Sequence, residues 1–150
     1  MRYFLDTEYN GFGGALISIA LVPEHGDQEF YATLPLPDDV HPWVARNVIP
    51  YLGSIPHGLD AAPAPRELAA TALANFLAGD PDPLIVADWP EDIAHFCGLV
   101  VTGPAEIVDL QSVRFHFLRT PGFSTAHNSR VPHNALHDAR ALRDFVMEWG

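Results

Sequence analysis

Lysine is absent from this 150-residue chain, and cysteine occurs once, at Cys97. A single cysteine excludes an internal disulfide, which favours a protein of the reducing cytoplasm. The cysteine and histidine spacings match no zinc site, and without lysine there is no Gly-x-x-x-x-Gly-Lys phosphate loop. We expect Cys97 on the inner side of a helix, within the core.

Long apolar runs are missing as well. No stretch approaches the roughly 18–20 apolar residues that span a bilayer, and the first residues lack the basic-then-apolar form of a signal peptide. We therefore expect no membrane partner. Hydrophobic residues make up 48% of the chain, enough for one core, so residues 1–150 are predicted to form one domain.

The first specific pattern is a pair of carboxylates, Asp6 and Glu8, at the end of a short apolar run. Residues two apart on a strand point to the same face, so these side chains should project side by side. Two like charges that close need a cation or a proton between them, and a divalent ion with oxygen ligands is the usual solution. A solvated strand end is the alternative interpretation.

The second pattern lies near the other end, where His133 and Asp138 are five positions apart. Apolar residues at three- and four-residue steps predict a helix of roughly 12 residues there. They are Leu136, Ala139, Leu142, Phe145 and Val146. Asp138 would lie in the first turn, near the positive end of the helix dipole, with His133 just before it. A surface cap is the alternative.

Together the two patterns resemble the DEDDh branch of the 3′→5′ exonucleases, which belong to the ribonuclease H-like superfamily. The Asp-x-Glu motif of that family is matched by Asp6 and Glu8. Its His-x-x-x-x-Asp motif, with Ala-Leu inside and Ala after, is matched by residues 133–139. The opening residues 2–8 resemble in particular a small bacterial exoribonuclease group of the family.

The family's second motif is an Asp in the first turn of the helix after the fourth strand. Residues 84–87 are predicted to be that strand, and Pro90 suits the first turn of the following helix. We favour Asp92 for the role, although Glu91 precedes it where the family has an aromatic residue. Asp88, at the strand end, is the substitute. One of the two could instead be a helix N-cap.

The resemblance implies an α/β, ribonuclease H-like fold with a central mixed five-stranded sheet, an antiparallel hairpin beside parallel strands, and flanking helices. Strands are predicted at residues 2–6, 15–22, 28–34, 84–87 and 106–110. Helices are predicted at 43–48, 67–77 and 91–98 and at the end of the chain. The apolar face of the helix over 67–77 is expected to comprise Leu68, Ala72, Leu73 and Phe76.

The resemblance further implies an exoribonuclease that releases nucleoside 5′-monophosphates. Two Mg²⁺ or Mn²⁺ ions would be held by Asp6, Glu8, Asp92 and Asp138. His133 would be the general base, since an imidazole with a pKa of about 6.5 is largely neutral at pH 7. His137 is the alternative base, but its spacing does not match the motif, and we expect it to be exposed.

The loop after Asp-x-Glu is expected to contact the terminal nucleotide. The candidate substrate-binding residues are Thr7, Tyr9, Asn10, Gly11, Phe12 and Asp88. Residues 111–132 hold three arginines among aromatic residues, and two interpretations stay open. The segment could face the substrate, or Phe115 and Phe117 could be core residues beside solvated arginines; the second is slightly favoured.

The net charge of the chain restricts the range of nucleic acids that we expect as substrates. Eight arginines oppose 19 acidic residues, a formal net charge of −11, whereas a broad nucleic-acid surface needs basic patches. We therefore expect RNA or short oligonucleotide 3′ ends as partners, with a homodimer left open. The alternatives are a nucleic-acid-end or nucleotide-binding module with little catalysis, a 3′→5′ DNA exonuclease, and a phosphohydrolase of small nucleotides.

Overall fold

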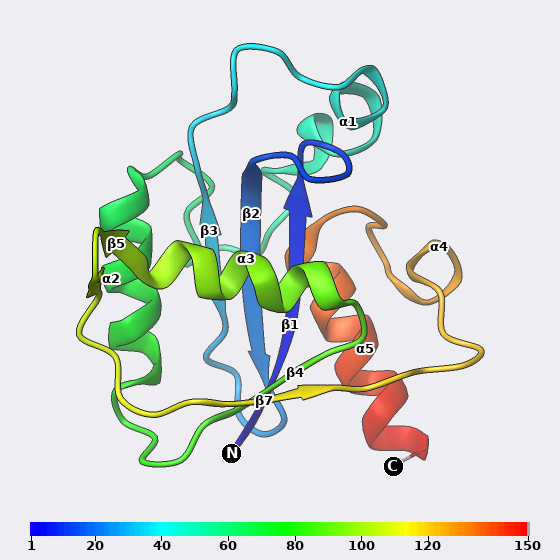
Figure 1. Ribbon diagram of the computed structural model, residues 1–150. Coiled ribbons are helices and arrows are strands. Elements are labelled where there is room, and N and C mark those ends of the chain that lie inside the picture. Colours follow the sequence, from blue (N-terminus) through cyan, green and yellow to red (C-terminus); the bar gives the residue numbers. More distant parts are fainter. Residues whose placement is uncertain (150) are drawn as a thin grey trace.

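The computed structural model describes residues 1–149, and it has the predicted α/β architecture. Five strands form one mixed sheet in the order β3-β2-β1-β4-β7 (Figure 1). Their bounds are Arg2–Tyr9 for β1, Leu16–Pro23 for β2, Phe30–Thr33 for β3, Leu84–Ala87 for β4 and Arg114–Phe117 for β7. The β1–β2 and β2–β3 pairs are antiparallel, while β4 runs parallel to β1 and β7. This arrangement is consistent with a ribonuclease H-like fold.

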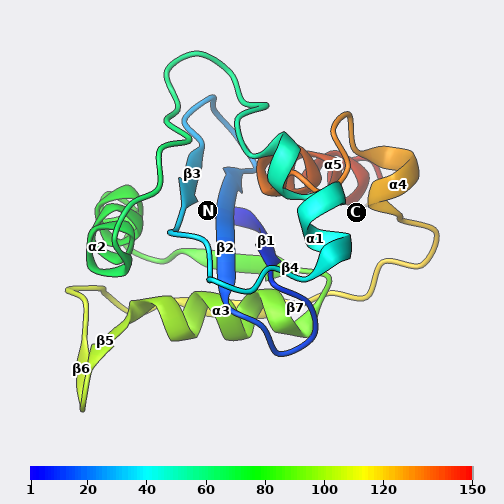
Figure 2. The same ribbon diagram turned by 90° about the horizontal axis from the view of Figure 1, so that it is seen from above.

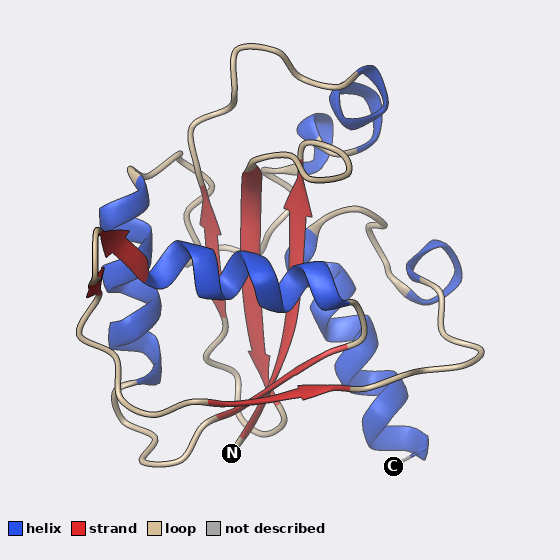
Figure 3. Cartoon of the chain, in the orientation of Figure 1, coloured by secondary structure: helices blue, strands red, loops and turns tan. Residues whose placement is uncertain are grey.

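Helices cover both faces of the sheet (Figure 3). The long ones are α2 (Arg66–Leu77), α3 (Pro90–Val100) and α5 (Ala135–Trp149). The short ones are α1 (Pro42–Asn47), the 3₁₀-helix η1 (Ile49–Tyr51) and α4 (Thr125–Asn128). Viewed from above, α3 and α5 lie on opposite sides of the sheet (Figure 2). No helix within residues 1–149 is long and apolar enough to cross a membrane.

The alternation of side chains along β1 divides the core into two layers. Tyr3 and Leu5 pack in the layer formed with α2 and α3, whereas Phe4 packs against Leu142 and Val146 of α5. Because successive residues of a strand point to opposite faces, Asp6 and Glu8 continue the row of Phe4. The strand thus directs both carboxylates toward the side of α5.

The fifth strand of the sheet is not the predicted one. Residues 106–110 contain β6 (Glu106–Ile107), which pairs with β5 (Val101–Gly103) in a separate two-stranded hairpin. Ala105, with φ of 56°, follows Pro104 in the turn, an arrangement typical of a type II turn. Since the chain reverses there, it reaches the sheet only at β7, which pairs with β4.

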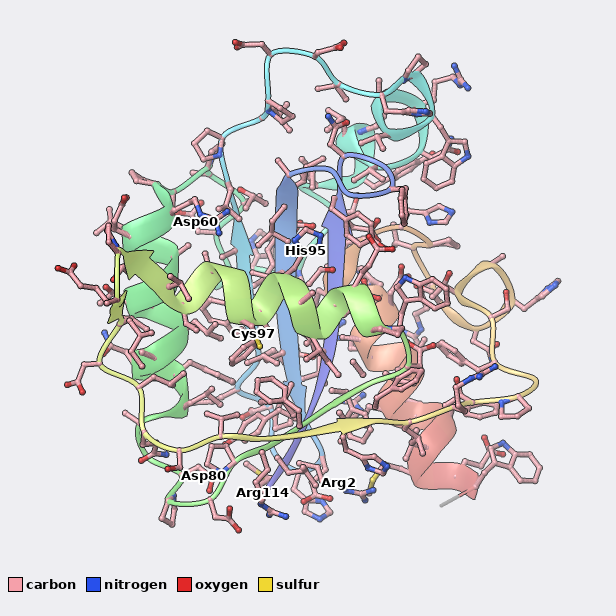
Figure 4. The ribbon with its side chains drawn as sticks, viewed as in Figure 1. Arg2, Asp60, Asp80, His95, Cys97 and Arg114 are labelled. Carbon is pink, nitrogen blue, oxygen red and sulfur yellow. The ribbon has the colours of Figure 1, made fainter. Side chains whose placement is uncertain are left out.

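Three predictions of burial are wrong. In α2, Leu68 and Ala72 are exposed, and the buried residues are Ala69, Ala70, Leu73, Ala74 and Leu77. Cys97 of α3 is exposed (Figure 4), because the face of α3 that carries Phe96 and Leu99 packs on the sheet. Phe115 and Phe117 are also exposed, on β7 at the edge of the sheet; the rings of Phe115 and Phe96 form a T-shaped pair with centroids 5.2 Å apart.

Candidate active site

Six acidic side chains and His133 converge at the carboxyl end of the parallel strands. Asp6 and Glu8 come from β1, Asp88 from the end of β4, and Asp92 and Asp138 from the first turns of α3 and α5. With Glu91 and His133 they line one cavity of about 580 Å³. The structure therefore brings together all the residues predicted for the metals and the base, although they are spread over 133 positions of the chain.

Hydrogen bonds hold one oxygen each of Asp92 and Asp138, while other carboxylate oxygens of the site stay without a donor in the described part of the chain. The Thr7 hydroxyl donates to Asp92 Oδ1 at 2.6 Å, and the backbone N–H of His133 donates to Asp138 Oδ2 at 3.0 Å. Within residues 1–149, Asp6 Oδ2 and Asp138 Oδ1 are buried and have no hydrogen-bond partner. A buried carboxylate oxygen without a donor is costly, so these atoms suit a cation better than a protein partner.

His133 is held in a strained backbone conformation. Its φ of 69° lies in the left-handed region, which costs a residue with a β-carbon about 1–3 kcal/mol. Its ring packs edge-on against Trp43, with centroids 4.8 Å apart. Ligand atoms of His133, Glu8 and Asp138 all lie within 4.8 Å of one another. In this backbone conformation the imidazole lies directly beside two of the carboxylates.

The first turn of α5 is fixed by Asn134, a residue that the sequence analysis missed. Asn134 is fully buried; its Oδ1 accepts from the N–H groups of Leu136 and His137 at 3.0 and 3.2 Å, and its Nδ2 donates to the Tyr51 carbonyl at 2.8 Å. An Asn directly before an amphipathic run is a recognisable N-cap signal. This cap fixes Asp138, one turn further along, at the cavity.

The expectation that His137 is exposed is wrong. His137 is half-buried, and its Nε2 lies 2.8 Å from the Ser54 carbonyl oxygen. Together with the Asn134–Tyr51 bond, this contact ties the start of α5 to η1 and to the residues that follow it. His137 lines a second cavity beside α5, separate from the one that Asp138 lines. It is therefore not placed to act beside Asp138.

Burial and mutual repulsion raise the pKa of every candidate ligand. Burial raises the pKa of Asp6 and Glu8 well above the ordinary range, and the neighbouring carboxylates add to the effect. Burial also raises the pKa of Asp92 to about 7 and that of Asp138 to about 6, although hydrogen bonds from Thr7 and His133 act in the opposite direction. The pKa of His133 is lowered by burial, which keeps its ring neutral.

The raised carboxyl pKa values predict that the metal-free protein loses stability as pH increases. A group with a raised pKa in the folded state stabilises that state below its unfolded pKa, and this contribution is lost as pH rises through the folded pKa. Burial lowers the pKa of His133 and His137, so these two histidines make stability increase with pH up to about pH 6.5. The loss of stability caused by the carboxyl groups is therefore expected between pH 6.5 and 8.

Thermal unfolding in EDTA should therefore give a melting temperature that falls between pH 6.5 and 8. Mn²⁺ should raise the melting temperature more at pH 8 than at pH 6.5, because it competes with fewer protons. A melting temperature in EDTA that stays constant or rises over this window would contradict the proposed electrostatics.

Most of the predicted substrate residues lie at the cavity, but one does not. Thr7, Tyr9, Gly11, Phe12 and Asp88 line it. Asn10 instead bonds to the backbone of residues 39–41. The cavity also has lining residues that the sequence analysis did not propose, namely His41, Trp43, Trp89 and Thr125.

Three exposed aromatic side chains stand at the cavity. Phe12 is 98% exposed, Trp43 44% and Trp89 55%. Large aromatic surfaces beside a polar cavity provide stacking platforms for nucleobases. The sequence did contain a signal for the two tryptophans. Each adjoins a proline, Pro42 or Pro90, that begins a helix, and residues at the start of a helix often lie near the surface.

Within residues 1–149, the cavity is lined by carboxylates without a matching set of arginines. Among the described residues no arginine lines it. Arg2 pairs with Glu24 and Arg114 with Asp82, and both arginines lie near the opposite end of the sheet with Asp80 (Figure 4). A larger cavity of about 760 Å³ beside α5 contains three arginines, but three carboxylates match them. They are Arg130, Arg140 and Arg143 against Asp27, Glu29 and Asp144.

The choice between Asp92 and Asp88 leads to a prediction. Asp92 is 3% exposed and is held by Thr7, whereas Asp88 is more exposed and has Thr120 Oγ1 at 3.4 Å. We expect Asp92→Asn to lower the turnover number at least about 10²-fold, typical of a lost electrostatic contribution, and Asp88→Asn to lower it less. Steady-state cleavage of a short RNA measures both. The reverse order would assign the ligand role to Asp88.

No protein-family model and no curated protein matches this chain.

Proposed function

We propose that this protein is a divalent-metal-dependent 3′→5′ exonuclease that acts on short, single-stranded 3′ ends, on RNA in preference to DNA, and releases nucleoside 5′-monophosphates. The observation that carries the proposal is the convergence of Asp6, Glu8, Asp92, Asp138 and His133 in one cavity at the carboxyl end of β1 and β4. Two buried and two half-buried carboxylates with raised pKa values are unfavourable together unless the site binds cations.

The donor set fits hard divalent cations. The oxygens of Asp6, Glu8, Asp92 and Asp138 are the ligand type of Mg²⁺ and Mn²⁺, and two of these oxygens have no other partner within residues 1–149. When bound, two such ions would lower the pKa of the attacking water and stabilise charge on the leaving 3′ oxygen. The acidic cluster therefore supports a metal-dependent hydrolase.

His133 is suited to remove a proton from the attacking water. Its ring is neutral because burial lowers its pKa, and it lies beside Glu8 and Asp138. The N–H of its own backbone holds Asp138 Oδ2, so the position of the base and that of a candidate ligand depend on each other. A ring nitrogen would accept the proton and pass it to solvent after cleavage.

The surroundings of the cavity favour a short single strand. A cavity without arginine in a chain of net charge −11 provides little attraction for the phosphates of a long duplex. Phe12, Trp43 and Trp89 instead offer unpaired bases a surface on which to stack. The preference for RNA follows from the resemblance of residues 2–8 to the small bacterial exoribonucleases.

A second candidate function is hydrolysis of small nucleotide phosphoesters, favoured by the same acidic surroundings. A cavity of about 580 Å³ lies within the usual range for small-molecule sites. Stacking aromatics would serve a single nucleotide as well as a terminal one. The choice between the two functions therefore depends on which substrate is cleaved faster.

The test uses a short RNA labelled at its 5′ end, the matching DNA, and nitrophenyl esters of nucleoside monophosphates. We expect stepwise shortening of the RNA from its 3′ end in Mn²⁺ or Mg²⁺, no shortening in EDTA, and slower cleavage of DNA. Faster cleavage of the esters would support the second candidate. Nucleotide binding without cleavage of any substrate would indicate a binding module. The absence of both binding and cleavage would refute the exonuclease, the phosphoesterase and the binding module alike.

A further inference from the structure

Asn10 and His41 form a connected pair at the rim of the cavity. Asn10 Oδ1 accepts from the backbone N–H of His41 at 2.8 Å, and Asn10 Nδ2 donates to the Asp39 carbonyl at 2.8 Å. Both groups of the amide side chain are therefore used within the protein. Asn10 is placed to hold the segment before α1, rather than to contact a nucleotide as the sequence suggested.

The loop that carries Asn10 is itself tightly constrained. The Asn10 N–H bonds to the Ala15 carbonyl, and the Gly14 N–H bonds to the Gly11 carbonyl, both at 2.9 Å. A β-carbon at Gly14 would lie 2.0 Å from the Asn10 carbonyl oxygen, so only glycine fits there. The end of β1, which carries Glu8, is thus rigidly connected to His41. Figure 1 shows α1 and this loop beyond the carboxyl end of β1.

The imidazole of His41 has a defined orientation and a defined tautomer. His41 is the N-cap of α1, and its Nδ1 accepts from the Trp43 N–H at 3.2 Å. A ring nitrogen that accepts a hydrogen bond carries no proton, so in the neutral ring the hydrogen is on Nε2. The Cδ2 atom next to Nε2 lies 3.7 Å from the β-carbon position of Gly11, which also lines the cavity.

We propose that His41 is a substrate-binding residue, whose Nε2–H donates a hydrogen bond to an oxygen of the terminal nucleotide, and that Asn10 is the positioning residue that holds it there. The inference rests on the proposed function, because it names a contact to the substrate of that site. In a cavity that no described arginine lines, this donor is well placed to bind a phosphate or ribose oxygen among the carboxylates.

The histidine offers a substitution that separates its two roles. Asn is among the best N-cap residues, so His41→Asn keeps an acceptor for the Trp43 N–H but removes the donor at Nε2. His41→Gln is longer and places an amide N–H near the former position of Nε2. The matched control is His57→Asn, because His57 is exposed and lines the other cavity.

Two quantities should be measured for each variant: KM and kcat on a short RNA in Mn²⁺, and the Kd of adenosine 5′-monophosphate in Mg²⁺ by calorimetry. We expect His41→Asn to raise KM and Kd roughly 10-fold, the order expected for one lost hydrogen bond, with kcat changed less than about twofold. His41→Gln should recover most of the loss, and His57→Asn should match the wild type. The melting temperatures of His41→Asn and His57→Asn should stay unchanged.

Two further comparisons test the details. Asn10→Ala should raise KM in the same way, and adding it to His41→Asn should cause little further change, since both act through one contact. Repeating the measurement with 2′-deoxy substrate narrows the choice of oxygen: an effect on RNA alone indicates the ribose 2′-hydroxyl, and equal effects on both indicate the phosphate or the 3′-hydroxyl.

The failure of this inference differs from the failure of the proposed function. Wild-type KM and Kd in His41→Asn, with normal cleavage, would overturn the role of His41 and leave the exonuclease intact. Higher KM and Kd with a lower melting temperature in His41→Gln, together with wild-type values in His41→Asn, would reduce His41 to a helix cap. A wild-type protein that neither cleaves RNA nor binds the monophosphate would overturn both.

Discussion

Replacement of Asp6 by asparagine is expected to abolish cleavage and, at the same time, to raise the melting temperature of the metal-free protein. The charges of Asp92, Asp138, Glu8 and Asp88 add to the effect of burial in raising the pKa of Asp6, and its Oδ2 is buried without a partner within residues 1–149. The amide of asparagine removes one charge and supplies two N–H donors to the carboxylates around it. Stability should therefore increase while a metal ligand is lost.

Activity and stability should be measured on the same preparations. Each kcal/mol of repulsion removed corresponds to about 2–4 °C in melting temperature for a chain of this size, so an increase of several degrees in EDTA is expected. Glu8→Gln should behave alike. The control is Asp109→Asn, which removes one charge from an exposed position and should alter neither property. Near-normal turnover of Asp6→Asn in Mg²⁺ would show that the proposed metal site is wrong.

The parts of the site that could be predicted depend on local periodicity. The two-residue period of a strand places Asp6 and Glu8 on one face, and the 3.6-residue period of the last helix places Asp138 in its first turn. Both expectations are met in β1 and α5. The strand at 84–87 was also predictable, because four apolar residues before Asp88 are too few for a buried helix and suit a buried strand of an α/β core.

The parts that were missed depend on contacts between distant segments. Residues 106–110 have strand-forming side chains, but the turn at Pro104 and Ala105 pairs them with β5 and leaves the sheet edge to β7. The face of α2 could not be chosen from sequence, because alanine and leucine occupy most of its circumference. Asn10 and His41 are 31 positions apart, and no local pattern connects them.

His133→Ala should lower the turnover number by roughly 10²–10⁴-fold while leaving metal and nucleotide binding intact, which is the usual loss for a general base. The wild-type rate should already be level near pH 7, because burial lowers the pKa of His133 below its ordinary value. Without the base, the remaining rate should increase with pH as hydroxide replaces it. Single-turnover cleavage of a short RNA across about pH 6–9 measures both profiles.

Two further variants separate the loss of the imidazole from changes in the backbone and in helix α5. Asparagine tolerates the positive φ of His133 better than alanine does, so His133→Asn should lose the base with the backbone and the bond to Asp138 preserved. His137→Ala, in the first turn of α5, should lose the contact to Ser54 and hence some stability, but change the rate little. If His133→Ala and His133→Asn cleave RNA at the wild-type rate, His133 has no part in the chemistry, and the resemblance to the DEDDh branch loses its catalytic meaning.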